Sequence, residues 1–412
     1  SGTSWEQVDT ILPATAQGND LFGIELDIEG DLLAVGAPFR RNAQGVMTGS
    51  VRLFRLVGET WVSEQEVFAG NGMHNDRFGR AIDVSGQLLV VGAPLASGLG
   101  SLEAGTGYLF RNDGTSWQQL VAIGGAVPLG RLGESVAIQG DIAFLGTAKQ
   151  GQQGKAVLVR SDGTWTRIGE VGAADYRTPD DDGSLEGDGF SGALLLTQGR
   201  LYVGASFARS SNPSGAGAVY VFDSDDGITW RQVEKLRAGD AATRDWFGGA
   251  LAGSGTTFLV GARLDDTPQG RDTGSASVFR LHEGTWVLED RLIVDSHRGG
   301  ENFGNSVAID GDVAVVGAFY EHTSRGSRAG AAYVFERAAG IWHQRARLLP
   351  PDGDSNDLFG LAVAVSGSTI AVSAPYAEES ERGVVHVFER QGSEWPHVAR
   401  LVSPSGQGRL LG

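Results

Sequence analysis

The sequence predicts an all-β fold, and within that class a seven-bladed β-propeller with four antiparallel strands in each blade. A segment of the type "DLFGLAVAVSGSTIAVSAP" occurs seven times, at steps of 54 to 58 residues. Each copy has the same succession of short apolar runs and Gly-rich turns, and no helical period occurs in any of them. Seven such units can pair their sheet edges and bury a continuous core by closing into a ring.

The register of the repeat is fixed by one apolar residue in each copy. These residues are Phe22, Phe78, Leu132, Phe190, Phe247, Phe303 and Phe359. A second landmark follows 14 positions later, at Gly36, Gly92, Gly146, Gly204, Gly261, Gly317 and, in the last copy, Ser373. The repeats therefore begin near residues 20, 76, 130, 188, 245, 301 and 357. Because this even spacing leaves no linker, we expect residues 1–412 to form a single propeller domain.

Each repeat contains four predicted strands. Alternating branched residues such as Leu26 and Ile28 indicate the first strand, and a Gly turn leads to a second apolar run such as "LLAVGA". The Gly-Ala-Pro that follows ends this run, since Pro cannot donate to a sheet. A third run such as "GAAYVFER" follows a variable loop, and a polar strand led by Trp comes last, as suits an outer edge. An open array of sheets is the alternative, but it requires distinct capping repeats.

The ends of the sequence leave one question open. Outer strands led by Trp occur eight times, against seven copies of the other three strands. Either the strand at Trp5 or the strand at Trp395 completes the seventh blade. The tail "GQGRLLG" ends where an eighth Phe-Gly would fall, so we expect the sequence to be part of a larger chain.

The Phe-Gly followed by Gly-Ala-Pro resembles the FG-GAP repeat. That repeat forms the seven-bladed propeller of integrin α-subunits and occurs in many bacterial surface and secreted proteins. The pattern here is most similar to the bacterial branch. The resemblance implies a secreted or cell-surface location and an adhesion or ligand-binding role.

Composition narrows the classes of partner. The net charge of −17 argues against a nucleic-acid partner, whose binding depends on Lys and Arg neutralising phosphates. There is no Cys, which excludes disulfides and thiol catalysis, and no apolar run approaches the roughly 20 residues of a membrane span. We therefore expect no nucleic-acid partner and no membrane insertion.

One face of the ring is the better candidate for binding. The turns between first and second strands ("IEGD", "VSGQ") and between third and fourth strands ("VGET", "HEGT") are short and uniform. The loops on the opposite face vary, as in "PFRRNAQGVMTG" and "RLDDTPQGRDTG", and variable loops on a rigid scaffold commonly carry binding sites. We expect a protein or glycan ligand at the variable-loop face. The candidate ligand-binding residues are Phe39, Arg40, Asp182, Phe207, Arg263, Tyr320 and Tyr376.

These candidates have structural alternatives. The aromatic residues could pack beneath their own loops, and the arginines could pair with acids nearby. An acid stands two residues before the key residue in six copies, at Asp20, Asp76, Asp188, Asp245, Glu301 and Asp357. These acids either form a negative funnel for a cation or accept backbone hydrogen bonds in their turns, as Asp commonly does.

Calcium is bound by the integrin-type members of the resembled family, through loops with alternating acids closed by Gly. The corresponding turns here, such as "DIEGD", are too short to wrap an ion, so we expect no calcium in them and no cofactor elsewhere. If any ion binds, the acid-rich insertion from Asp180 to Asp188 is the predicted place.

Catalysis finds little support in the sequence. Its seven His residues lack metal-ligand spacing, and no G-x-S-x-G elbow occurs. We assign no catalytic residue and expect a binding module. The alternative is a polysaccharide-active propeller enzyme, a lyase or hydrolase, with its site on the same face. A converging cluster of His, Tyr and Arg would favour the enzyme.

Overall fold

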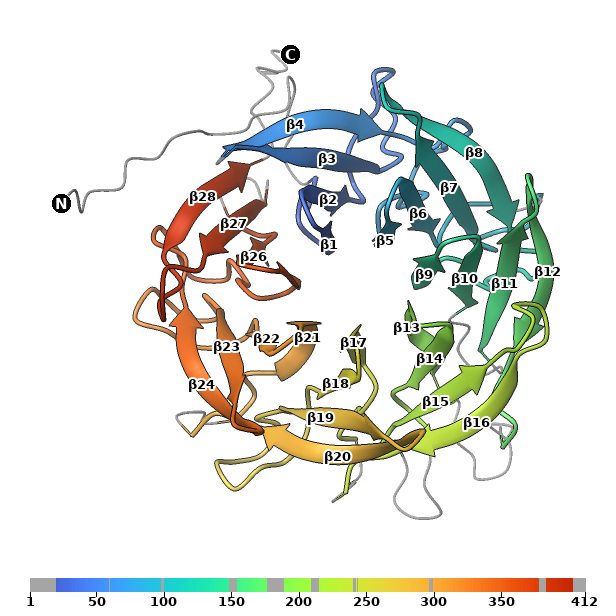
Figure 1. Ribbon diagram of the computed structural model, residues 1–412. Coiled ribbons are helices and arrows are strands. Elements are labelled where there is room, and N and C mark those ends of the chain that lie inside the picture. Colours follow the sequence, from blue (N-terminus) through green and yellow to red (C-terminus); the bar gives the residue numbers. More distant parts are fainter. Residues whose placement is uncertain are drawn as a thin grey trace, which may run out of the picture.

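The structure, a computed structural model, is a ring of sheets arranged around a central axis (Figure 1). It describes residues 20–58, 60–97, 100–147, 154–175, 189–208, 215–239, 242, 244–295, 299–377 and 383–402. In these residues the chain forms seven four-stranded sheets and no α-helix. The prediction of an all-β, seven-bladed propeller is confirmed. None of the described segments could therefore cross a membrane as a helix.

Every blade is an antiparallel meander whose strands follow one another in chain order from the channel outward. The first three blades are β1 (Leu26–Glu29), β2 (Leu32–Ala37), β3 (Ser50–Val57) and β4 (Thr60–Val67); β5 (Ala81–Ser85), β6 (Leu88–Ala93), β7 (Thr106–Asn112) and β8 (Trp117–Gly124); and β9 (Val136–Gln139), β10 (Ile142–Thr147), β11 (Lys155–Ser161) and β12 (Trp165–Val171). The fourth and fifth are β13 (Phe190–Thr197), β14 (Arg200–Ala205), β15 (Ala218–Asp223) and β16 (Arg231–Leu236); and β17 (Ala250–Ser254), β18 (Thr257–Ala262), β19 (Ser275–His282) and β20 (Thr285–Leu292). The last two are β21 (Phe303–Asp310), β22 (Val313–Ala318), β23 (Ala331–Ala338) and β24 (Ile341–Leu348); and β25 (Val363–Ser366), β26 (Thr369–Ala374), β27 (Val384–Glu389) and β28 (His397–Val402).

The constant spacing between the two sequence landmarks has a hydrogen-bond cause. In the first blade the N–H of Gly23, just after the key Phe, donates to the carbonyl of Gly36 over 2.9 Å. The last blade makes the same bond, from Gly360 to Ser373, over 2.8 Å. Gly23 and Gly360 have φ values of 91° and 90°, a backbone conformation that residues other than Gly rarely adopt. The Phe-Gly and Gly-Ala motifs therefore close the two ends of one hairpin onto each other.

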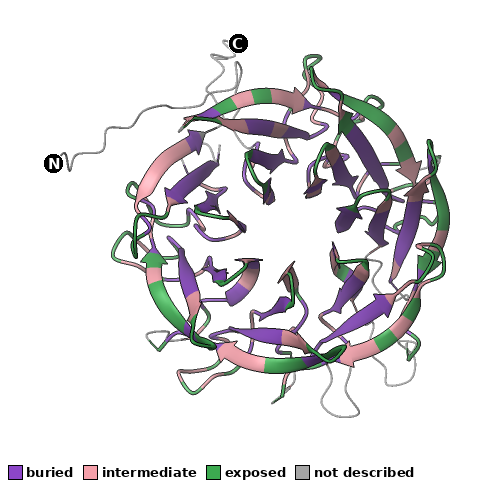
Figure 2. Ribbon diagram, viewed as in Figure 1, coloured by how far each residue is buried: buried purple, intermediate pink, exposed green. Residues whose placement is uncertain are grey.

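The hydrophobic core lies between blades. One cluster joins blades six and seven around Phe359, and another joins blades seven and one around Phe22. The middle strands are almost wholly buried, whereas the outermost strands are partly exposed (Figure 2). Each blade buries its faces only against its neighbours, so the ring must close to complete the core.

The seventh blade is closed by the C-terminal strand. β28 pairs with β27, and Trp395 is buried in the cluster between blades six and seven. Of the two strands that the sequence left open, the one that follows Trp395 completes the seventh blade. The segment at Trp5 lies outside the described residues.

Candidate functional site

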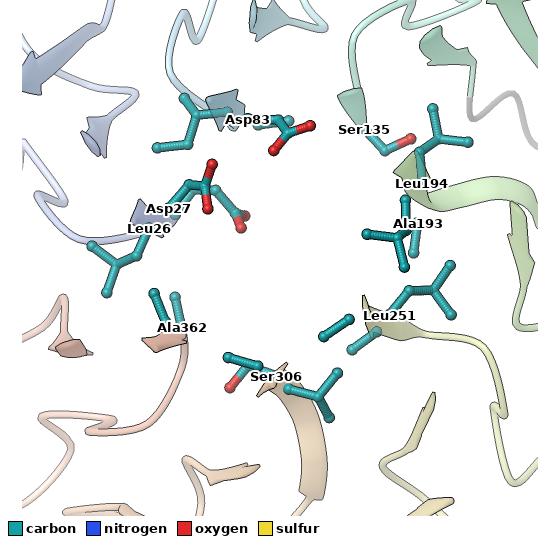
Figure 3. Close-up of a pocket in the computed structure, with 18 of the residues that line it drawn as sticks. Leu26, Asp27, Asp83, Ser135, Ala193, Leu194, Leu251, Ser306 and Ala362 are labelled. Carbon is teal, nitrogen blue, oxygen red and sulfur yellow. The ribbon is translucent and has the colours of Figure 1, made fainter. Parts of the chain in front are cut away.

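The channel along the ring axis is a cavity of about 850 Å³ lined by the innermost strands. Its walls differ from one side to the other. The carboxylates of Asp27 and Asp83 lie on one side, and Leu194 and Leu251 lie on the other (Figure 3). An asymmetric channel can orient a ligand, whereas a symmetric ring of identical side chains could not.

The asymmetry comes from one position of the repeat, five residues after the key residue. Asp27 and Asp83 fill it in blades one and two. The other five blades carry small or apolar residues there: Ala137, Leu195, Ala252, Ala308 and Ala364. The two acids are therefore a departure from the repeat and are not required to build a blade.

The two aspartates are tied to the backbone and to each other. Asp27 accepts hydrogen bonds from the backbone N–H groups of Ile28, over 2.9 Å, and Val84, over 2.7 Å. Asp83 accepts from the N–H of Ile138 over 2.6 Å and shares a side-chain hydrogen bond with Asp27. Burial raises the pKa of both, and the neighbouring Asp27 charge raises the pKa of Asp83 further. Both carboxyl groups are therefore harder to ionise than a solvent-exposed Asp side chain.

Glu25 lies two residues before Asp27 and also lines the channel. Burial raises its pKa to about 7, while Arg80 opposes that shift. The guanidinium of Arg80 lies 4.0 Å from the Glu25 carboxylate and 3.8 Å from that of Glu134. A carboxyl group with a pKa near neutrality can exchange a proton with a ligand at physiological pH.

An aromatic and cationic cluster lies on blades four and five, where the channel meets the variable loops. Phe207 and Trp246 meet edge to face, with ring centroids 5.0 Å apart. The guanidinium of Arg263 lies over the Trp246 ring, 4.3 Å from its centroid. Its Nη1 donates to Asn305 Oδ1 over 3.2 Å. All four residues line the channel, so two predicted site residues, Phe207 and Arg263, meet there.

The other predicted aromatics are half-buried on neighbouring loops and do not line the channel. Phe39 carries the guanidinium of Arg77 over its ring at 5.2 Å. Tyr320 packs on Phe319, and Arg328 lies over its ring at 5.0 Å. The backbone N–H of Tyr376 donates to the backbone carbonyl of Asp357 over 3.4 Å. Their part in binding stays a prediction.

Arg40 is held by buried ion pairs. Its side chain is 5% exposed and lies 3.0 Å from Asp20 and 3.1 Å from Glu66. This geometry agrees with the pairing alternative raised from the sequence. The last predicted site residue, Asp182, lies outside the described residues, as does the whole acid-rich insertion from Asp180 to Asp188.

The acids that precede the key residue act in their turns. The carboxylates of Asp76 and Asp357 each accept the backbone N–H of the residue three positions earlier, over 2.6 Å. Asp245 makes the same contact to Ala242. All three carboxylates are buried, so they stabilise the turns and do not form an open funnel. In the described part of the chain, no group of three or more His, Cys, Asp or Glu is placed to hold a metal ion.

Sequence reasoning missed two features of this region. Trp246 is the one Trp of nine that does not lead an outer strand, and that irregularity was the available signal. Asp27 and Asp83 lie within predicted strands, where the alternation of apolar residues does not single them out. The signal in the sequence is that Trp246, Asp27 and Asp83 each differ from the residues that most other copies have at the same repeat position.

Comparison with known proteins gives the family. The family model described as FG-GAP repeat matches residues 5–54, 61–110, 230–279, 286–335 and 342–388, which together make up more than half of the chain. This chain belongs to the FG-GAP repeat family. The unmatched residues 111–229 include blade three and the first three strands of blade four, where Leu132 replaces the key Phe and Ser191 replaces the Gly of Phe-Gly. The resemblance to FG-GAP repeats is therefore confirmed.

Solved structures resemble the FG-GAP propeller in fold. One is a crystal structure of a protein from Bacteroides uniformis assigned as a 6-phosphogluconolactonase. The two are 12% identical, with a TM-score of 0.57 over 91% of this chain and 97% of that chain. At this identity the likeness concerns the fold alone. A search of curated proteins found no match to the sequence.

Proposed function

We propose that this FG-GAP propeller is a secreted or cell-surface adhesion module that binds a protein or glycan through its variable-loop face. The secreted or surface location rests on the similarity to bacterial FG-GAP proteins. The scaffold supports binding because each blade is fixed by backbone hydrogen bonds, which leave the loops free to vary.

The observation that carries the proposal is the cluster of Phe207, Trp246 and Arg263 at the channel. Aromatic rings and arginines are the side chains that most often dominate binding energy at interfaces. These three also stand beside a cavity, so a ligand can lose water on several sides at once. The positive φ of Trp246, 59°, recurs at the same repeat position in other blades, as at Arg77 and Leu358, but blade five alone carries an aromatic residue there.

The test is a glycan array together with a pull-down from the native environment, comparing the protein with its Trp246→Ala variant. We expect the bound ligand to be lost from the variant while the melting temperature changes little. A matched control is Gln87→Lys, which adds a charge to an exposed residue of the short β5–β6 turn on the opposite face. If Gln87→Lys abolishes binding and Trp246→Ala does not, the short-turn face is the binding face.

A polysaccharide-active enzyme is the second candidate, and the channel carboxylates favour it. Glycoside hydrolysis commonly uses two carboxyl groups, one of them with a raised pKa. Glu25, with a pKa of about 7, and the Asp27–Asp83 pair supply such groups within one cavity. Release of reducing ends from polysaccharides, lost in Glu25→Gln, would establish this activity. Binding without any product would leave adhesion as the function.

A further inference from the structure

Arg263 differs from other arginines near the variable-loop face in the kind of partner that its guanidinium has. Arg40 lies against two carboxylates, and Arg291 and Arg347 are each paired with a buried acid. In the described part of the chain, Arg263 is half-buried with an amide oxygen and an aromatic ring around it and no carboxylate in salt-bridge distance. Burial lowers its pKa, as expected for a cation whose lost hydration no neighbouring anion offsets.

The guanidinium is held in place before any ligand arrives. Trp246 supports it from one side, and Phe207 packs against Trp246 in turn. Asn305 accepts from Nη1 and is itself fixed, since its Nδ2 donates to the carbonyl of Leu361 over 3.2 Å. A guanidinium has five N–H donors in a rigid fork whose geometry matches a carboxylate. Among the described residues, Arg263 donates one side-chain hydrogen bond, from Nη1 to Asn305 over 3.2 Å.

The opposite wall offers a different chemistry. Asp27 and Asp83 present carboxyl oxygens to the same cavity, and these oxygens can accept hydrogen bonds. Such groups suit the hydroxyls of a sugar. A volume of about 850 Å³ fits a small ligand or one end of a chain, in contrast to a flat protein surface.

We infer that the channel binds a carboxylated sugar, with its carboxylate on Arg263 and its hydroxyls toward Asp27 and Asp83. This inference rests on the proposed function and names the ligand class for the same site. The net charge of −17 does not prevent it, because salt screens charges beyond about 8 Å at physiological ionic strength. At hydrogen-bond distance the guanidinium fork of Arg263 can hold a carboxylate through two charged hydrogen bonds.

The experiment compares D-glucuronate with D-glucose, two sugars that differ in the carboxylate, by ligand-observed NMR titration of the whole protein. We expect glucuronate to bind at least about tenfold more tightly than glucose, the effect of one charged hydrogen-bonding pair. Arg263→Gln should remove that preference. The control Arg271→Gln changes an arginine whose side chain is 85% exposed on a loop of the same blade and should bind glucuronate like the unchanged protein.

Arg263→Lys keeps the positive charge but lacks the guanidinium fork. It is the variant to test if Arg263→Gln does not fold. We expect Arg263→Lys to bind glucuronate with intermediate affinity. Equal affinity for the two sugars, no binding of either, or an unchanged preference in Arg263→Gln would each overturn the inference. If instead the array identifies a neutral glycan or an acidic protein that depends on Trp246, the proposed function stands and the sugar-acid class is wrong.

Discussion

One position of the repeat, 18 residues after the key residue, carries a buried charge in three blades. It is Arg40 in blade one, Asp265 in blade five and Glu321 in blade six. Each pairs with an opposite charge on the outermost strand of its blade, at Glu66, Arg291 and Arg347 respectively. The sign is reversed between the first blade and the other two, so the function of this position is to tether the loop to the blade.

The first prediction at this scale concerns Arg40→Ala. Removing Arg40 takes its cation away from the buried Asp20 carboxylate, while Glu66 keeps its ion pair with Arg52, and loss of one partner of a buried ion pair costs about 3–5 kcal/mol of unfolding free energy. Urea unfolding should show this loss, while ligand binding per folded molecule stays unchanged. The control is Arg41→Ala, which removes an exposed arginine from the same loop and should change stability by less than about 0.5 kcal/mol. If Arg40→Ala instead loses ligand binding and keeps its unfolding free energy, Arg40 is a ligand-binding residue.

Blade seven has a buried histidine where three other blades have tyrosine. His386 pairs across the sheet with Val372, as Tyr108 does with Val91 and Tyr333 with Val316. Its Nδ1 lies 3.0 Å from Nε2 of His397, and Asp352, which Arg400 also contacts, lies 3.8 Å from its other ring nitrogen. Burial, aided by the neighbouring His397, lowers the pKa of His386 to about 3, and burial also lowers the pKa of His397.

The sign of the resulting pH dependence follows from proton binding. Between about pH 6.5 and pH 3 the unfolded chain binds a proton at His386 that the folded protein does not bind, so stability falls as pH falls. In His386→Tyr we expect the loss of stability between pH 6.5 and pH 4 to be smaller by on the order of 2 kcal/mol. Urea unfolding across this pH range measures it. His343→Tyr, at an exposed histidine of β24, should leave the pH profile unchanged.

At the scale of the element, the repeated glycines explain how neighbouring blades approach each other. A Cβ placed on Gly261 would lie 2.0 Å from the carbonyl oxygen of Gly304 in the next blade, and one on Gly317 would lie equally close to that of Gly360. The seam between blades seven and one differs, since Ser373 replaces the glycine of the Gly-Ala pair. The Gly-Ala motif is therefore an inter-blade contact as well as a strand end.

We accordingly predict that Gly261→Ala destabilises the protein by about 2–3 kcal/mol or more, because backbone must move to admit the methyl group. Thermal or urea unfolding gives the value. Gly169→Ala is the matched control, since a Cβ at Gly169 in the outer strand β12 would meet no atom within 4 Å. Its stability should be unchanged or slightly raised, because Ala restricts the unfolded chain more than Gly. Equal losses of stability in the two variants would contradict the close contact between blades at Gly261.

At the scale of the whole molecule, the ring closes between its last and first blades by the same devices that join the others. The Ser366 hydroxyl accepts the N–H of Gly30 across this seam over 3.1 Å. The Ser254 hydroxyl accepts that of Gly311 between blades five and six over 3.0 Å. Leu401 of β28 is buried in the cluster that spans the closing seam. The last and first blades are thus joined by a hydrogen bond and by apolar packing, as neighbouring blades within the ring are.

From this closure we predict that Leu401→Ala and Leu348→Ala have similar effects. The two leucines are the same repeat position in blades seven and six, 1% and 3% exposed, and losing either should cost about 2–5 kcal/mol. Both variants should unfold in one cooperative transition when followed by circular dichroism and by Trp fluorescence. A separate early transition in Leu401→Ala alone would show that blade seven opens independently and that the ring is weakest where it closes.

The sequence by itself determined the blade count, the strand order and the face that carries the variable loops. These follow from local patterns: alternation sets the strands, and the glycines near Phe22 and Gly36 set the hairpin ends. Each copy repeats the same local pattern, so seven copies made that part of the prediction secure. The family followed from the same motif.

Only the tertiary structure decided which terminal strand completes blade seven, because the strands after Trp5 and Trp395 have equivalent patterns. It also decided that Arg40 is a buried tether, while Arg263 meets Trp246 at the channel. The acids Asp27 and Asp83 come together from adjacent blades, 56 positions apart in the chain. Such contacts join side chains from separate repeats, and they depend on the rotation between blades and on loop conformation, neither of which is encoded in a pattern local to one repeat.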